Sequence, residues 1–337
     1  MTQQIIYVSC PESHQVYIWR LDNYKKKLTL IQVIQTLGNA QPIVIHPNKK
    51  FLYIGIRPDF QIITYHIDQA GLLHHIHSTV KIAISPTYLT INKSGTFLYC
   101  ASYNYNTINI ISINKLGIAS NSIQTINNLP GCHSVNIDNQ EQLLWVPCLK
   151  EDVIKLFCIH NITGTLTAFN PSCIKIMIGS GPRHMIFHSS SNYAYVINEL
   201  NGTINVIKYN SKKTILSIIQ TINILPNYPF KNFWASDIHI TPDNRWLYCS
   251  DRFTNTISCF RVCSETKTLQ FINCQNTETQ PRGFAIDSTG MFLIIAGQKS
   301  HHISLYNINL NNGKLNIISR YPSGIGPMWI SVLNSDI

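Results

Sequence analysis

The sequence contains little charge for its length. Of its 337 residues, only 12% are Asp, Glu, Lys or Arg, while 45% are hydrophobic. This composition excludes an intrinsically disordered chain, which is highly charged and poor in apolar residues, and it also excludes a coiled coil. No run of about 18 uncharged apolar residues occurs, so we expect no membrane span. The N-terminus lacks a basic segment followed by an apolar one, so we expect a cytoplasmic protein rather than a secreted one.

Several motifs with well-defined chemistry are missing. The ten cysteines include no Cys-x-x-Cys pair, so the sequence predicts neither a zinc site nor a redox motif, and it indicates reduced thiols. There is no Gly-x-x-x-x-Gly-Lys-Ser/Thr loop, which argues against nucleoside triphosphate use. There is no Gly-x-Ser-x-Gly elbow, which argues against a serine acyl-enzyme. We therefore expect no metal and no cofactor.

Acidic residues are scarce relative to basic ones. Sixteen acidic residues face 26 Lys and Arg, which gives a formal net charge of +10. Such a balance is compatible with nucleic acid, an anionic membrane or an anionic small molecule. The lysines are scattered, however, and the densest run, at 25–27, has no interleaved aromatics. We therefore expect neither nucleic acid nor membrane as a partner. Nucleic-acid binding is the weakest alternative, and it predicts a strongly salt-dependent affinity.

An internal repeat runs through the chain. A turn followed by an aromatic-rich strand recurs at 46–53, 92–99, 241–248 and 287–294, with weaker copies at 138–145 and 188–195. The residue at the start of the preceding strand, which we name the first inner position, recurs at intervals of 46, 46, 50, 53, 46 and 46 residues; its members are Gln41, Thr87, His133, Arg183, Ser236, Arg282 and Met328. A period of about 40–50 residues with four short strands is typical of a β-propeller blade.

The two ends of the chain complete each other. The last copy stops after its first strand, at 328–333, whereas the N-terminus begins with a second strand, at 5–8. If the termini share one blade, the ring closes and no open sheet edge remains within it. The sequence therefore predicts an all-β, seven-bladed β-propeller that forms a single domain over residues 1–337.

The topology of a propeller brings the first inner positions together around one end of the central channel. The ends of the second strands lie at the same face, and they hold Pro11, Arg57, Tyr103, Leu149, Glu199, Arg252 and Gln298. Equivalent positions in a purely structural repeat carry similar residues, but in this chain His, Arg and Glu differ from blade to blade. Buried charges are costly unless paired. We therefore predict a polar, cationic pocket; the alternative is a network of ion pairs that closes the channel, such as Arg183 with Glu199.

The residue types in this pocket suggest a hydrolytic site. His133 can transfer protons near neutral pH, and Glu199 can accept a proton or orient His133. Arg183 and Arg282 can hold an anionic group or stabilise an oxyanion. This set suits the addition of water to an ester-like carbonyl of an anionic small molecule.

Several sequence segments resemble the seven-bladed β-propeller lactonase family, in particular its bacterial members. The strongest are Gly-Cys-His-Ser at 131–134, Leu-Trp-Val-Pro at 144–147, Gly-Pro-Arg-His-Met at 181–185, Asn-Glu-Leu-Asn at 198–201, and the segments 237–243, 277–284 and 296–302. The resemblance implies hydrolysis of 6-phospho-D-glucono-1,5-lactone to 6-phosphogluconate, in the second step of the oxidative pentose phosphate pathway. It requires no cofactor.

The resemblance also implies roles for individual residues. A related branch of the family uses a His, two Arg and a Glu, whose motif positions correspond to the predicted catalytic residues His133, Arg183, Glu199 and Arg282. The predicted substrate-binding residues are Arg57, Lys150, His184, Asp237, Arg252 and Lys299, of which the basic side chains other than His184 would hold the phosphate. The sequence leaves open whether His133 or Glu199 activates water.

Two rival functions remain open. One is a lactonising or delactonising enzyme that acts on a muconate-type carboxylate. The other is a non-catalytic propeller that serves as an interaction platform, which predicts a large exposed apolar patch where the sequence places polar and basic residues. We expect a monomer or a weak homo-oligomer.

Overall fold

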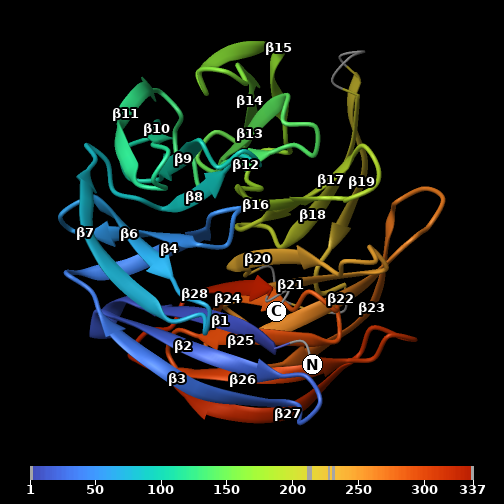
Figure 1. The fold of residues 1–337 in the computed structure, drawn as a ribbon. Helices are drawn as coiled ribbons and strands as arrows, with labels where there is room; N and C mark the ends of the chain where they lie inside the picture. The colour runs from blue at the N-terminus through green and yellow to red at the C-terminus, as the bar shows by residue number, and fades with distance from the viewer. Residues whose placement is uncertain (1–2, 211–214, 227, 230–231, 335–337) are drawn as a thin grey trace.

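Each sequence repeat forms one four-stranded antiparallel sheet. The computed structural model describes residues 3–210, 215–226, 228–229 and 232–334, and over these residues seven such sheets surround a central channel (Figure 1). Alternating apolar residues fill the space between neighbouring sheets, as expected for strands buried on both faces. The predicted seven-bladed β-propeller is therefore confirmed.

The four strands of each blade follow one another from the channel outward. Blade 1 contains β28 (Trp329–Asn334), β1 (Gln3–Cys10), β2 (Gln15–Asp22) and β3 (Lys27–Gln35). Blade 2 contains β4 (Asn39–Ile45), β5 (Phe51–Arg57), β6 (Gln61–Ile67) and β7 (Leu73–Lys81). Blade 3 contains β8 (Tyr88–Ile91), β9 (Phe97–Ser102), β10 (Thr107–Ile113) and β11 (Ala119–Ile126). Blade 4 contains β12 (Asn136–Ile137), β13 (Leu143–Cys148), β14 (Val153–Ile159) and β15 (Leu166–Lys175).

The remaining three blades have the same order. Blade 5 contains β16 (Pro182–Phe187), β17 (Tyr193–Asn198), β18 (Thr203–Asn210) and β19 (Ile215–Asn223). Blade 6 contains β20 (Ala235–Ile240), β21 (Trp246–Asp251), β22 (Thr256–Val262) and β23 (Leu269–Asn276). Blade 7 contains β24 (Pro281–Ile286), β25 (Phe292–Gly297), β26 (His302–Ile308) and β27 (Leu315–Pro322).

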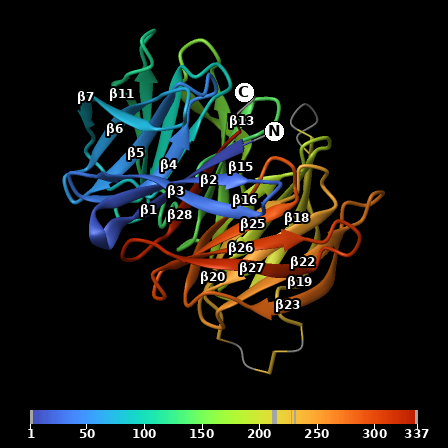
Figure 2. The ribbon, with the colours of Figure 1, turned by 60° about the horizontal axis from the view of Figure 1, so that its bottom comes forward.

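The two ends of the chain close the ring, as predicted. β28 pairs with β1 in an antiparallel register that runs from Gln4 opposite Asn334 to Ser9 opposite Trp329. The N- and C-terminal segments lie close together in both ribbon views (Figures 1 and 2). Within the described ranges the single helix is the short 3-10 turn η1 (Pro11–Ser13), and no helix is long and apolar enough to cross a membrane.

The repeated aromatic residue in the second strand joins most of the blades to their neighbours. In five blades a buried tyrosine donates its hydroxyl hydrogen to a backbone carbonyl in the turn between the third and fourth strands of the following blade. The pairs are Tyr7–Gly71, Tyr53–Gly117, Tyr99–Gly164, Tyr195–Lys267 and Tyr248–Gly313, at 2.6–3.1 Å. The spacing of the sequence repeat therefore determines both the strands of each blade and the position of the tyrosine that bonds to the next blade.

A β-bulge near the start of the inner strand shapes the channel. In blades 2, 5, 6 and 7 the register with the second strand shifts at this point, between Ala40 and Ile43, Pro182 and His184, Ala235 and Ile238, and Pro281 and Gly283. A bulge re-aims a side chain that regular pleating would turn away. Because of it, the consecutive residues Arg183 and His184 both line the channel.

The tyrosine hydrogen bonds between blades give the first prediction. Replacing Tyr53 with Phe removes the hydroxyl that donates to Gly117 O at 2.7 Å and leaves a buried carbonyl without this partner. We expect the free energy of unfolding to fall by about 1 kcal/mol. Urea unfolding measures the change, with Tyr24→Phe as the control, because the Tyr24 side chain is 89% exposed. Equal stability of the two variants would contradict a stabilising role for the hydrogen bond between Tyr53 and Gly117.

Candidate active site

The central channel contains a cavity of about 280 Å³. Six of the seven first inner positions line it, namely Gln41, Thr87, His133, Arg183, Arg282 and Met328, whereas Ser236 does not. The residues that follow add Tyr88, His184, Asp237 and Trp329. The predicted convergence of residues from different blades on one pocket is therefore observed.

A single carboxylate holds two arginines at the edge of this cavity. Glu199 Oε2 lies 2.8 Å from Arg183 Nε and 2.8 Å from Arg252 Nη2, and both guanidinium groups are almost completely buried. Arg252 also donates to the carbonyls of Trp234 and Ala235 and stacks on the Trp234 ring at 3.9 Å. The ion pair between Arg183 and Glu199 that the sequence suggested is present, and it leaves the cavity open rather than filling it.

Two of the three guanidinium nitrogens of Arg183 are fixed by contacts. Its Nη1 donates to the Ser236 carbonyl and to His184 Nε2, the latter at 3.1 Å, while its Nε faces Glu199. Among the described residues no contact uses its second terminal nitrogen, Nη2. A rigid guanidinium with one free N–H edge is suited to bind a developing negative charge.

Arg282 differs from Arg183 in having no partner. Its guanidinium lines the cavity without a hydrogen bond or an ion pair to any residue that the structure describes. Burial and the neighbouring charge of Arg183 lower the pKa of Arg282 to about 10, at which it is still charged at neutral pH. An unpaired cation that is partly shielded from water is costly, so this position favours an anionic ligand.

His133 is a neutral imidazole among cations. The side chain is buried, and within the described residues its Nδ1 has no hydrogen-bond partner. Burial, followed by the charges of Arg183, His184 and the other arginines, holds the pKa of His133 well below its ordinary value. At neutral pH His133 is therefore unprotonated, and once protonated it is a strong acid that readily gives the proton up.

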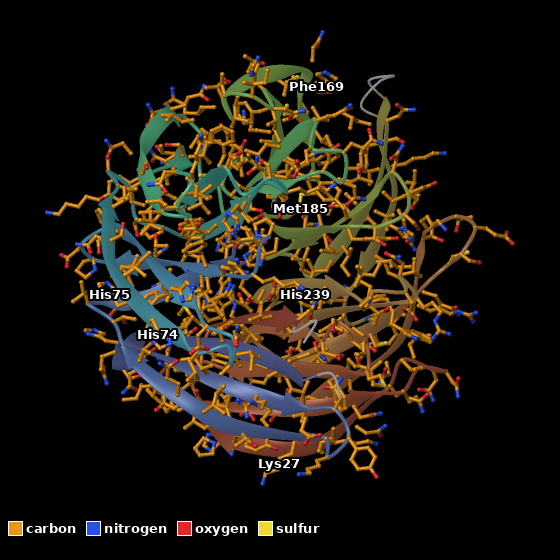
Figure 3. The ribbon with its side chains drawn as sticks, viewed as in Figure 1. Lys27, His74, His75, Phe169, Met185 and His239 are labelled. Atoms are coloured by element: carbon orange, nitrogen blue, oxygen red, sulfur yellow. The ribbon has the colours of Figure 1, made fainter. Side chains whose placement is uncertain are left out.

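Two further histidines surround Asp237 inside the channel. Asp237 Oδ1 lies 2.8 Å from His184 Nδ1, and Oδ2 lies 3.2 Å from His239 Nε2. The His184 ring packs against His133 at 5.1 Å and against Tyr88 at 5.2 Å between ring centroids. In Figure 3, His239 lies toward the middle of the ring, whereas Lys27 and Phe169 lie on outer strands.

The remaining predicted basic residues differ in whether they contact residues that line the cavity. Lys150 is exposed, with its Nζ 4.7 Å from the Tyr103 ring, which in turn packs 5.6 Å from the His133 ring. Arg57 donates to the Pro86 carbonyl and to Thr87 Oγ1. Lys299 Nζ pairs with Glu12 Oε1 at 3.7 Å. The structure thus brings Lys150 and Arg57 next to lining residues, but not Lys299.

The sequence prediction missed one layer of the channel. Val44, Thr90, His239 and Ser331 line the cavity and stand three residues after a first inner position, on β4, β8, β20 and β28. These residues also recur at equivalent positions of the sequence repeat, which is the signal that could reveal them. A step of three residues, however, places both side chains on the same face of a strand only if a β-bulge interrupts the alternation. His239 is the exception, because the sequence places it on the same strand and side as Asp237 and indicates that the two either extend the site or form a structural hydrogen bond between blades.

Comparisons with known proteins agree with this architecture. The family described as "Lactonase, 7-bladed beta-propeller" matches residues 5–332. A 6-phosphogluconolactonase from Blochmanniella floridana is 60% identical over 335 residues, which cover 99% of both chains. A 6-phosphogluconolactonase from Pectobacterium carotovorum subsp. carotovorum is 43% identical over 334 residues, which cover 99% of this chain and 100% of the relative.

A solved structure extends the likeness to the fold. The periplasmic gluconolactonase of Pseudomonas aeruginosa superposes with a TM-score of 0.90 at 22% identity, covering 98% of this chain and 99% of that one. At this identity the match shows the fold alone. The match of the family over almost the whole chain, together with the close relatives, shows that the chain belongs to the seven-bladed β-propeller lactonase family.

Proposed function

We propose that this enzyme hydrolyses 6-phospho-D-glucono-1,5-lactone to 6-phosphogluconate, in the second step of the oxidative pentose phosphate pathway. One observation supports this most strongly: His133, Arg183 and Arg282, from three different blades, line a single cavity with a surplus of positive charge. The chain also belongs to a lactonase family in which close relatives carry the name of this activity.

The surplus of positive charge matches the substrate. Arg183, Arg252 and Arg282 outnumber the two carboxylates beside them, those of Glu199 and Asp237, so the cluster remains cationic. A sugar phosphate carries nearly two negative charges at neutral pH, because its second pKa is about 6. A buried cationic pocket binds such an anion strongly and attracts it from solution.

The free edges of the two arginines are placed to polarise the lactone carbonyl. Arg183 is held by Glu199, Ser236 and His184 on its Nε and Nη1, so Nη2 is available to the C1 oxygen. Arg282, which has no partner in the described residues, completes the oxyanion site from the neighbouring part of the cavity. Preorganised donors of this kind contribute about 10²–10³-fold each to turnover.

His133 is the proposed general base. It is neutral, buried and unpaired at Nδ1 among the described residues, whereas Oε2 of Glu199 is occupied by two guanidinium groups. His133 takes a proton from water as the water oxygen bonds to C1. The tetrahedral oxyanion then collapses, the bond between C1 and the ring oxygen breaks, and the protonated His133 returns its proton to that oxygen. Glu199 orients the arginines.

The phosphate binds at the rim in this proposal. Lys150 is exposed beside Tyr103, so its ammonium group can reach a group that remains outside the cavity. The Arg252 guanidinium is buried against Glu199 and remains a predicted contact. The lactone ring then enters the cavity, whose lining includes Trp329 and Tyr88. Arg57 and Lys299 remain predicted contacts of secondary importance, because each already has a partner.

The proposed setting follows from the substrate and the thiols. We place the enzyme in the cytoplasm, where sugar phosphates are metabolised and where thiols such as Cys100 and Cys249 remain reduced. The proposed mechanism uses only side chains of this chain, and it requires neither a nucleic acid nor a membrane.

A coupled assay with freshly prepared lactone tests the function. The wild type should hydrolyse it above the spontaneous rate, and His133→Ala and Arg183→Ala should each lower kcat by about 10²-fold, because each removes a base or an oxyanion donor. Arg245→Ala is the control, since Arg245 pairs with Asp243 on an exposed turn. No excess rate for the wild type would overturn the proposed function, and wild-type turnover in both folded variants would overturn the site.

A second substrate tests the phosphate contact. Lys150→Ala should raise KM for the phosphorylated lactone about tenfold, the effect of losing a charged hydrogen bond worth ~1.5 kcal/mol. The KM for unphosphorylated glucono-1,5-lactone should not change. Lys155→Ala is the matched control, because Lys155 pairs with Glu151 on β14. Equal KM changes for both substrates would exclude Lys150 as a phosphate ligand.

A further inference from the structure

We propose that His184 and Asp237 are positioning residues that hold the Arg183 guanidinium from behind and act on hydrolysis through it, without contacting the substrate. This inference rests on the proposed function. It assigns to these two residues a role different from the substrate binding that the sequence suggested, and it is supported by the directions of their hydrogen bonds.

The contact with Arg183 determines which ring nitrogen of His184 carries the proton. His184 Nε2 lies 3.1 Å from Arg183 Nη1. A guanidinium can only donate hydrogen bonds, so Nε2 must accept. The single proton of the neutral ring is therefore on Nδ1, which donates to Asp237 Oδ1 at 2.8 Å. Both nitrogens are used, so His184 has none left for substrate.

His184 is neutral under physiological conditions. Burial and the adjacent charge of Arg183 lower its pKa to about 4, although the hydrogen bond and charge of Asp237 act in the opposite direction. The rings of His133, Tyr88 and Trp329 pack around it at 5.1, 5.2 and 6.3 Å between centroids. The ring is thus held both by its hydrogen bonds and by its neighbours.

Each carboxylate oxygen of Asp237 accepts two hydrogen bonds. Oδ1 accepts from His184 and from the backbone N–H of Ile238 at 3.0 Å. Oδ2 accepts from His239 at 3.2 Å and from the backbone N–H of Phe284 at 3.2 Å. Burial alone would raise the pKa of Asp237, but the charge of His239 and the hydrogen bonds from both histidines hold it well below its usual range. Asp237 is therefore a fixed acceptor and a poor base.

The chain of contacts crosses three blades. Arg183 and His184 lie on β16, Asp237 and His239 on β20, and Phe284 on β24. The bulges in β16 and β20 bring these side chains into the channel. Glu199 holds Arg183 from its other side, so the guanidinium is fixed between an ion pair and the acceptor nitrogen of His184. The free Nη2 edge is thereby aimed at the cavity.

Two substitutions at His184 separate these contacts. His184→Gln can place an amide oxygen near the position of Nε2 and keep an acceptor for Arg183, whereas His184→Asn can keep only the donor to Asp237. We expect His184→Asn to lower kcat about 10-fold or more, the scale of a small misplacement of a catalytic group, and His184→Gln to lower it less. KM for the lactone should stay within about threefold of wild type, because the phosphate contacts are elsewhere.

Asp237→Asn tests the other end of the chain. If the amide NH₂ faces His184, it forces the proton to Nε2, where it meets the donor Arg183; if it faces the other way, it meets the backbone N–H of Phe284. Either arrangement should lower kcat about 10-fold or more, with little change in KM. His188→Gln is the matched control, because His188 is a buried histidine outside the cavity lining that bonds Ser190 N through Nδ1. It should reduce stability without changing kcat.

A measurement on the wild type keeps the proposal testable even if a variant fails to fold. ¹⁵N NMR of the histidine rings, with the His184 signals identified by their loss in His184→Gln, should show the proton on Nδ1. A proton on Nε2, or equal kcat for His184→Asn and wild type, would overturn the positioning role alone. An inactive wild type would instead overturn the proposed function, and with it this inference.

Discussion

The site depends on one buried carboxylate between two guanidinium groups. Glu199 Oε2 faces Arg183 and Arg252 at 2.8 Å each, in a channel where neither arginine has more than marginal contact with solvent. Removing such charges from water costs several kcal/mol per ion unless partners replace the lost hydration. Glu199 provides part of that compensation, and the backbone carbonyls of Ser236, Trp234 and Ala235 provide more. The compensation is incomplete, because Arg282 has no partner among the described residues. This remaining positive charge gives the pocket its preference for an anion.

The same charge determines the acid–base chemistry. Burial and several neighbouring cations lower the affinity of His133 for protons, so His133 remains neutral, and its imidazolium form readily returns the proton. Asp237 and His184 provide a second fixed point, which aims Arg183 through the neutral imidazole of His184. The propeller tolerates this concentration of cations because contacts outside the site hold the blades together. The tyrosine hydroxyls bond successive blades, and β28 and β1 close the ring.

Much of this arrangement could be predicted from the sequence, because a repeat converts sequence spacing into spatial position. The seven blades, the shared terminal blade and the lining by His133, Arg183 and Arg282 all follow from the recurrence of equivalent positions. The bulges could not be predicted, since they depend on how the inner strand meets its neighbours around the channel. Without them, Arg183 and His184 would point to opposite sides of the sheet. The partners of individual side chains could not be predicted either, because local geometry decides among several possible ones. Lys299 pairs with Glu12, and Arg57 bonds Pro86 and Thr87.

A crystal structure with bound 6-phosphogluconate tests the central claim most directly, because it places both anionic ends of the product. The account predicts the carboxylate within hydrogen-bond distance of Arg183 Nη2 and the Arg282 guanidinium, close to His133, with the phosphate at the rim beside Lys150. In the same structure His184 should remain bonded to Arg183 and Asp237 and should not contact the product. A product bound outside the channel, or bound with its phosphate against Tyr88 and Trp329, would contradict the account.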